Sequence, residues 1–282
     1  MLKAWAWASR CWLHSPRYNE LMENINAYKA LAFFDLDGTL LNGQSQLDTD
    51  VIDAIHEIRR NGVLPFIATG RGHFELDNIM EATGITGAVA MNGQYIVLDG
   101  QTIYKDPISV ENIEKLHSLA IEQDEALAFY GKDGYWVDRH TNFVHEAYSY
   151  THMLLPKINP EGYKTEEVNM LLLLTDKLSQ VDYYKAHIPE LNFFMNAPTS
   201  IDITNISTNK GTGITHVKDV LNFKGETYAF GDGRNDLHLL AAADHGTAMG
   251  NAVPELKEIA DFISSKNTEN GIVNAFKHWN FI

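Results

Sequence analysis

The chain has a single cysteine, no long apolar run and a shortage of basic residues. Cys11 alone excludes an internal disulfide framework and a zinc site built from cysteines. No apolar run approaches the roughly 18 residues of a membrane span, so we expect no membrane partner. Against 37 acidic side chains stand only 22 basic ones, a net charge of −15. Without a basic run, we expect no nucleic-acid partner either.

What the chain does have is apolar material for a core: 45% of its 282 residues are hydrophobic. That is enough for one large domain or two smaller ones. No internal repeat or low-complexity segment is evident. We expect a monomer or a small homo-oligomer.

The first 21 residues differ in composition from the rest. Trp5, Trp7 and Trp12 are three of the chain's five tryptophans. The apolar stretch around them is too short for the core of a signal peptide. We expect residues 1–21 to be a disordered leader, tag or misassigned start, with a mitochondrial targeting peptide as the weaker alternative. The expected location of the protein is cytoplasmic.

Buried strands alternate with amphipathic helices in the next part of the chain. The apolar runs at 30–35 and 63–68 are typical of buried strands, although Pro65 suggests a strained or edge-adjacent start for the second. Residues 48–60 have helical spacing of apolar side chains, and 87–91 is a further strand. This alternation favours an α/β fold with a Rossmann-like parallel sheet and crossover helices.

A second pattern interrupts the first. Residues 94–104 are typical of a hairpin, after which 107–198 has helices and strands of its own, at 109–122, 126–130, 168–174 and 191–195. We expect the parallel pattern to resume at 200–203 and to continue to the end of the chain. The sequence therefore predicts a discontinuous core, residues 22–106 and 199–282, with an inserted α/β domain at 107–198.

The most informative motif follows the first strand. Asp35 and Asp37 end the apolar run two positions apart, before a turn at Gly38. Because side chains alternate along a strand, the two carboxylates share a side if the extended geometry persists. At 4 Å and an effective dielectric near 20 they would repel by about 4 kcal/mol. A cation or a shared proton relieves such repulsion, so the pair indicates metal-assisted or acid–base chemistry.

Three further motifs stand where ligands of open α/β sheets bind, beyond strand ends. Thr-Gly-Arg at 69–71 offers a hydroxyl and free N–H groups that suit a phosphate. Lys210 opens a helix and can place a charge on an anion. Asp232 and Asp236 add oxygen ligands of the kind magnesium prefers. Singly, these residues have plainer interpretations: turn, solvated charge and helix cap.

Together the four motifs resemble those of the haloacid dehalogenase-like hydrolase superfamily, in particular its Cof-type phosphatases. The matching residues are 35–40 for the first motif, Thr69 for the second, Lys210 for the third and 231–236 for the fourth, with further similarity at 91–93 and 248–252. The similarity covers about 28–282. It implies a Rossmann-like core with an α/β cap at 107–198 that chooses the leaving group.

The resemblance implies a magnesium-dependent phosphatase. Asp35 is the expected nucleophile, which forms an aspartyl-phosphate. Asp37 is expected to protonate the leaving oxygen and then to take a proton from the attacking water. The expected metal ligands are Asp35, the backbone carbonyl of Asp37 and Asp232, with Asp236 close or bound through water.

The resemblance also implies the residues that hold the phosphoryl oxygens, namely Thr69, Gly70, Lys210 and Asn235. Arg71 is either an assistant of the site or a surface charge. Weaker candidates for contacts from the cap side are Asn92, Arg139, His140 and His145. The expected substrates are small phosphorylated metabolites, sugar phosphates foremost. A sugar phosphomutase and a catalytically silent ligand-binding protein remain as alternatives.

Overall fold

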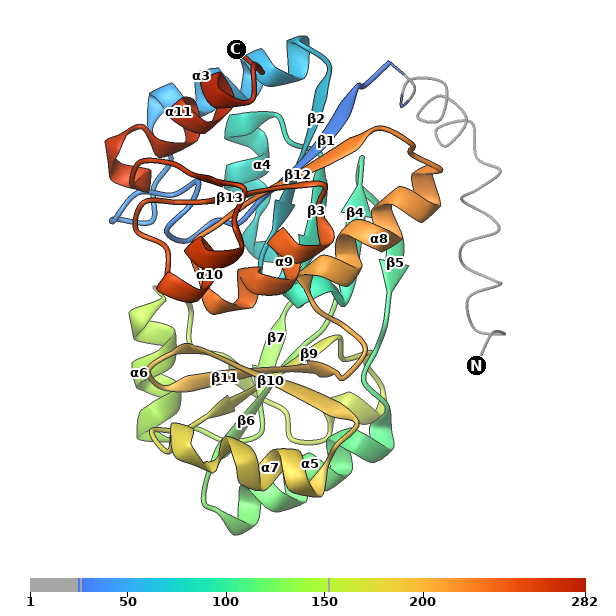
Figure 1. Ribbon diagram of the computed structural model, residues 1–282. Helices are drawn as coiled ribbons and strands as arrows, with labels where there is room; N and C mark the ends of the chain where they lie inside the picture. The colour runs from blue at the N-terminus through green and yellow to red at the C-terminus, as the bar shows by residue number, and fades with distance from the viewer. Residues whose placement is uncertain (1–24, 26, 152) are drawn as a thin grey trace.

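Two sheets of different topology organise the chain (Figure 1). The computed structural model describes residue 25, residues 27–151 and residues 153–282. The extension expected at 1–21 lies outside these described residues. The larger sheet has eight strands in the order β14-β13-β12-β1-β2-β3-β4-β5, and the smaller has six in the order β10-β11-β9-β6-β7-β8. We call them, with their helices, the larger and the smaller unit.

The larger sheet combines strands from both ends of the chain. Its members are β1 (Ala30–Phe34), β2 (Val63–Ala68), β3 (Gly87–Ala90), β4 (Tyr95–Leu98), β5 (Gln101–Lys105), β12 (Glu226–Gly231), β13 (His245–Ala248) and β14 (Phe262–Ile263). The strands from β14 to β3 are parallel, and β3, β4 and β5 are antiparallel. Every residue of β1 and β2 is buried, as their continuous apolar runs predicted. The expected Rossmann-like α/β core is confirmed.

Helices supply the crossovers that parallel strands require. They are α3 (Thr49–Arg60), α4 (Asp77–Thr83), α9 (Leu237–Ala242) and α10 (Pro254–Ile259). The larger unit also contains α8 (Lys210–Leu221), which precedes β12, and α11 (Gly271–His278), which follows the last strand. The helix predicted at 48–60 is thus confirmed as α3. Pro65 pairs with Ala32 of β1 and precedes Phe66, where pairing with β3 begins, as expected for an edge-adjacent start.

The smaller unit has its own, mostly antiparallel sheet. Its strands are β6 (Ala126–Tyr130), β7 (Tyr135–Val137), β8 (Lys157–Ile158), β9 (Met170–Leu174), β10 (Leu191–Ala197) and β11 (Ser200–Asn205). Its helices are α5 (Val110–Glu122), α6 (Asn142–Tyr150) and α7 (Val181–His187). In the part of the chain that the structure describes, no helix is long and apolar enough to cross a membrane.

One topological prediction is wrong. The strand at 200–203 does not resume the parallel core, because β11 pairs antiparallel with β10 and β9 in the smaller sheet. The two residues between β10 and β11 are too few for a crossover and close a hairpin instead. Ile201 and Ile203 are fully buried in the core of the smaller unit. The chain therefore returns to the larger sheet only after Asn205, and the boundary expected at 199 falls inside this hairpin.

The two units pack against each other near the carboxyl end of β3. A single hydrophobic cluster contains Met91, which follows β3, together with Tyr130 and Met170 of the smaller sheet. Figure 1 shows the smaller unit below the larger one, at this end of the parallel strands. Ligands of open α/β sheets bind at such an edge, so the smaller unit covers the expected site.

Candidate active site

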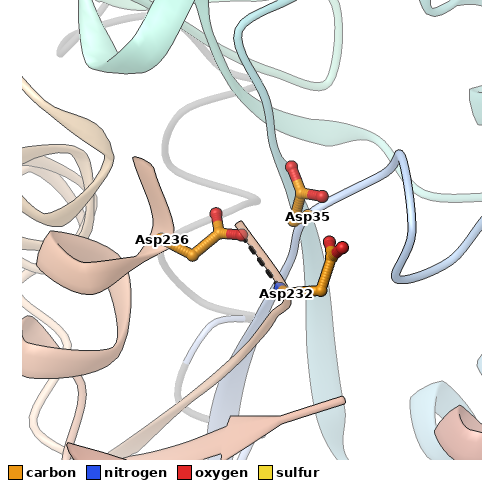
Figure 2. Close-up of side chains that lie close together, drawn as sticks. All are labelled: Asp35, Asp232 and Asp236. Carbon is orange, nitrogen blue, oxygen red and sulfur yellow. Dashed lines mark hydrogen bonds between the residues drawn. The ribbon is translucent and has the colours of Figure 1, made fainter. Parts of the chain in front are cut away.

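Three carboxylates converge at the carboxyl ends of two neighbouring strands (Figure 2). Asp35 follows β1, Asp232 follows β12, and Asp236 ends the short 3₁₀ turn Arg234–Asp236. One oxygen of each residue lies within 4.8 Å of the others. Because β1 and β12 are parallel neighbours, residues almost 200 positions apart meet at the same edge.

Two glycines leave the space that these carboxylates occupy. Gly38 has φ +85°, and a Cβ there would lie 2.3 Å from Asp232 Oδ2. A Cβ at Gly231 would lie 2.6 Å from the Cγ of Asp236. Any larger residue would collide with the carboxylates, so both motifs need glycine for packing, and Gly38 is needed for the turn as well.

Lys210 lies beneath the cluster and pairs with two of its members. Its Nζ donates hydrogen bonds to Asp35 Oδ1 at 2.5 Å and to Asp236 Oδ1 at 2.7 Å. The side chain is fully buried, so the plain interpretation of Lys210 as a solvated charge is wrong. Burial alone would lower the pKa of Lys210, but the charges of Asp236 and Asp35 outweigh it and raise that pKa. Lys210 therefore stays charged at neutral pH.

Asp236 combines a structural and an electrostatic role. Its Oδ2 accepts hydrogen bonds from the backbone N–H groups of Asp232 at 3.0 Å and Gly233 at 2.9 Å, and Figure 2 marks the first of them. Its Oδ1 accepts from Lys210. The plain interpretation of Asp236 as the cap of the following helix is wrong, since its side chain makes no cap hydrogen bond to α9. One of its oxygens instead fixes the preceding turn, while the other contributes charge to the cluster.

Asp232 is held by two residues to which we assigned no role from the sequence. Thr39 Oγ1 donates to Asp232 Oδ1 at 3.2 Å. Asn251 Nδ2 donates to Asp232 Oδ2 at 3.2 Å and to the backbone oxygen of Gly38 at 2.8 Å. Both lie inside segments that carried the resemblance, Thr39 in the first motif and Asn251 near the C-terminus. Only the fold shows that they orient the same carboxylate.

The cluster carries more negative charge than its surroundings neutralise. Burial, followed by the charge of Asp236, raises the pKa of Asp35 well above its usual value, although Lys210 opposes the shift. Burial and Asp236 also raise the pKa of Asp232 to about 6, although Thr39 opposes that shift. A divalent cation relieves such repulsion, and carboxylate oxygens are the ligands that magnesium prefers. The three residues fit a metal of this kind.

The carboxylate of Asp37 lies outside this cluster. Backbone extension ends with β1, and the chain turns at once, since the Leu40 N–H donates to the oxygen of Asp35. The alternation argument therefore does not place the two side chains together. Arg71 instead binds Asp37 with two hydrogen bonds, Nε to Oδ2 at 2.9 Å and Nη2 to Oδ1 at 2.5 Å. Arg71 is thus paired with Asp37 rather than an isolated surface charge.

The residues expected to hold a phosphate lie in the loops at the carboxyl ends of the strands beside β1 or contact Asp35 itself. Lys210 contacts Asp35 directly. Thr69 is buried after β2, on one side of β1, and its Oγ1 accepts from the Arg71 N–H at 3.1 Å. Asn235 is half-buried after β12, on the other side. Gly70 lies where the smaller unit meets the larger, since a Cβ there would be 3.0 Å from Asp202 Oδ2 of β11.

Of the candidates for contacts from the cap side, only Asn92 is placed near these residues. Its Nδ2 donates to Asp202 at 3.0 Å. Arg139 donates to the backbone oxygen of Glu125, at the end of β6 that points away from the larger unit. His140 hydrogen-bonds the backbone oxygen of Pro156, and its ring lies 5.6 Å from that of His145. Arg139 and His140 therefore make contacts within the smaller unit itself.

Comparisons with known proteins agree with this geometry. The family model of haloacid dehalogenase-like hydrolases matches residues 32–276. The Bacillus subtilis protein YkrA is 36% identical over 250 residues, which cover 88% of this chain and 96% of YkrA. The phosphatase YwpJ, also from Bacillus subtilis, is 26% identical over 290 residues, with 88% of this chain and 99% of YwpJ covered.

Two solved structures share the whole arrangement of both units. A phosphatase of this superfamily from Bacteroides thetaiotaomicron superposes with a TM-score of 0.83 at 30% identity, covering 91% of this chain and 97% of that one. A sugar phosphatase of subclass IIB superposes with a TM-score of 0.81 at 28% identity, covering 90% and 100% of the two chains. Each match spans both the larger and the smaller unit.

Proposed function

Since this chain belongs to the haloacid dehalogenase-like hydrolases and is a phosphatase, we propose that it uses magnesium to hydrolyse sugar phosphates and similar small phosphorylated metabolites. The observation that carries the proposal is that the carboxylates of Asp35, Asp232 and Asp236 lie close together and that a buried lysine, Lys210, pairs with the cluster. In this proposal the smaller unit is the cap that admits the substrate.

Asp35 is the proposed nucleophile, because its carboxylate pairs with Lys210 and follows β1, between the strands after which Thr69 and Asn235 lie. Lys210 holds Oδ1, which leaves Oδ2 to attack phosphorus and form an aspartyl-phosphate. Lys210 also favours the ionised form of Asp35 that the attack requires, against the burial that raises its pKa. Magnesium held by Asp35, Asp232 and Asp236, with the backbone carbonyl of Asp37, would neutralise phosphoryl charge when bound.

Asp37 is the proposed proton carrier. Its carboxylate pairs with Arg71, and in this proposal it takes a proton from the water that attacks the aspartyl-phosphate. Protonation of the leaving oxygen requires the acid form, and therefore a turn of Asp37 away from Arg71. Thr69, Gly70, Lys210 and Asn235 would then hold the phosphoryl oxygens.

Hydrolysis of an aryl phosphate with magnesium tests the proposal. We expect Asp35→Asn to lose more than about 1,000-fold in kcat, because the amide cannot form the covalent intermediate. Asp53→Asn changes an exposed carboxylate of α3 in the same way and should keep full activity. If Asp35→Asn retains turnover, the nucleophile is misassigned.

Product analysis separates the alternatives. Release of inorganic phosphate from a hexose phosphate supports hydrolysis, and an isomerised hexose phosphate would instead identify a mutase. Failure to turn over any member of a broad phosphate panel would favour a ligand-binding protein. The intact carboxylate cluster and its paired lysine argue against the last outcome.

A further inference from the structure

Polar side chains of the two units meet around Gly70, next to the Asp37–Arg71 pair. A Cβ at Gly70 would lie 3.0 Å from Asp202 Oδ2 and 3.2 Å from Asn92 Nδ2. Asn92 donates to Asp202 across the junction of the units at 3.0 Å. Because Gly70 belongs to the proposed phosphate-binding loop, this contact lies beside the reacting group, on the side from which the smaller unit approaches.

Asn92 has an unused acceptor. Only 1% of the residue is exposed, and its Oδ1 has no hydrogen-bond partner among the described residues. That oxygen lies 3.4 Å from the Cβ position of Gly70, so it faces the loop. The Asn92 N–H donates to the backbone oxygen of Thr69 at 2.9 Å, which fixes the residue in place. A buried carbonyl without a partner is costly, and a donor on a ligand would satisfy it.

The groups around this acceptor are predominantly negative. The nearby positive charge of Arg71 is paired with Asp37 through two hydrogen bonds. Glu75, partly buried after the Arg71 loop, accepts from the Gly72 N–H at 2.6 Å. Its carboxylate lies close enough to Asp202 and Asp37 for both to repel its charge. The surroundings therefore favour hydrogen-bond donors and disfavour anions.

Aromatic packing holds the two units together at this point. The ring of Phe74, from the larger unit, lies 6.0 Å from Tyr130 and 5.6 Å from Tyr135 of the smaller one. Tyr130 and Tyr148 are buried, and their hydroxyls are 3.2 Å apart. These contacts hold the two units together beside the hydrogen bond between Asn92 and Asp202.

We propose that Asn92 and Asp202 form a leaving-group subsite for the alcohol part of the substrate. It accepts hydrogen bonds from hydroxyl or amino groups near the phosphate ester, and the carboxylate of Asp202 repels leaving groups that carry a carboxylate of their own. This inference rests on the proposed function, because the subsite is defined by its place beside the phosphate-binding loop. It selects polyhydroxylated or amino-bearing phosphate esters over phosphorylated acids.

Three probes test the subsite in the full-length protein with magnesium: a hexose 6-phosphate, 3-phosphoglycerate and para-nitrophenyl phosphate. We expect the natural chain to prefer the hexose ester over 3-phosphoglycerate in kcat/KM by about tenfold or more. In Asp202→Asn, the ratio of kcat/KM for the hexose ester to that for the aryl ester should fall about tenfold, and discrimination against 3-phosphoglycerate should weaken.

Asp176→Asn is the matched control, since Asp176 is an exposed carboxylate beyond β9, at the end of the smaller sheet away from Asn92. It should leave all three ratios unchanged. Unaltered ratios in Asp202→Asn, with the aryl ester still hydrolysed, would overturn the subsite and leave the proposed function standing. Absence of turnover with every probe would overturn the proposed function itself.

Discussion

Lys210 contributes both to the chemistry of the site and to the stability of the fold, and the sequence motif alone does not distinguish these two roles. Lys210 neutralises Asp35 and Asp236 at once, and both of its ion pairs are buried. A buried pair contributes little net stability compared with an apolar replacement, but removal of one partner leaves charge without compensation. The consequences of changing this lysine therefore differ from those of changing a surface lysine.

We expect Lys210→Met to lower the free energy of unfolding, measured in urea, by about 3–5 kcal/mol, because Asp35 and Asp236 lose their shared counter-charge. Lys218→Met serves as the control on the same helix. Lys218 pairs with Asp244 at 3.5 Å and its side chain is 32% exposed, so its loss should cost no more than about 1 kcal/mol. Equal losses for the two variants would contradict this account of the buried pair.

Glu75 makes stability depend on pH. Burial raises its pKa to about 7, against the Gly72 N–H and Arg71, which lower it, while Asp202 and Asp37 add to the rise. The folded protein thus binds this proton more tightly than the unfolded chain, so stability falls as pH rises from about 4.5 to above 7. We expect Glu75→Gln to be more stable than the natural chain at pH 8, by up to about 3 kcal/mol.

The test is urea denaturation at pH 4.5 and pH 8. The gain from Glu75→Gln should shrink to about 0.4 kcal/mol at the lower pH, where the natural carboxyl is neutral in the folded protein and half neutral in the unfolded chain. Glu81→Gln, an exposed position of α4, should show no gain that depends on pH. A gain of the same size at both pH values would mean that packing, and not ionisation, is responsible.

At the scale of elements, the turn after β1 decides how the first motif works. Gly38→Ala would strain a residue with φ +85° and place its Cβ 2.3 Å from Asp232. We expect a loss of about 1–3 kcal/mol in stability and a fall in kcat, since the carboxylate must move. Gly43→Ala, with nothing within 4 Å of its Cβ, should be nearly neutral in thermal melts.

The same scale explains the mistaken strand at 200–203. Alternating apolar and polar residues predict a strand with one buried face, but they do not show which strands it pairs with. The hairpin between β10 and β11 settles the pairing, and it turns Asp202 away from the buried isoleucines on either side of it. The element that we expected to rebuild the core instead brings a carboxylate to the junction of the two units.

At the scale of the whole molecule, the metal should couple activity to stability. We expect EDTA to abolish hydrolysis and added magnesium to raise the melting temperature, because a ligand that binds only the folded chain stabilises it by about 2.7 kcal/mol at 100 times its Kd. Asp232→Asn should lose most of that magnesium-dependent rise. Undiminished turnover in EDTA would refute the metal assignment.

The sequence by itself determined the parallel core, the helices between its strands and the identity of the carboxylates at its edge. Continuous apolar runs, cap residues and strand-end motifs are local patterns, and they carry this information because backbone geometry repeats along the chain. The hairpin of β4 and β5 and the helix α5 were predictable for the same reason.

Only the tertiary structure decided which of these residues act together. The pairing of Arg71 with Asp37, the support of Asp232 by Thr39 and Asn251, and the approach of Asp202 to Asn92 all join residues from different elements. Such contacts depend on strand order and on how the two units pack, which no local pattern records. For the same reason, the motifs identify a phosphatase, while the subsite that we propose for its leaving group emerges only from the packing of the two units.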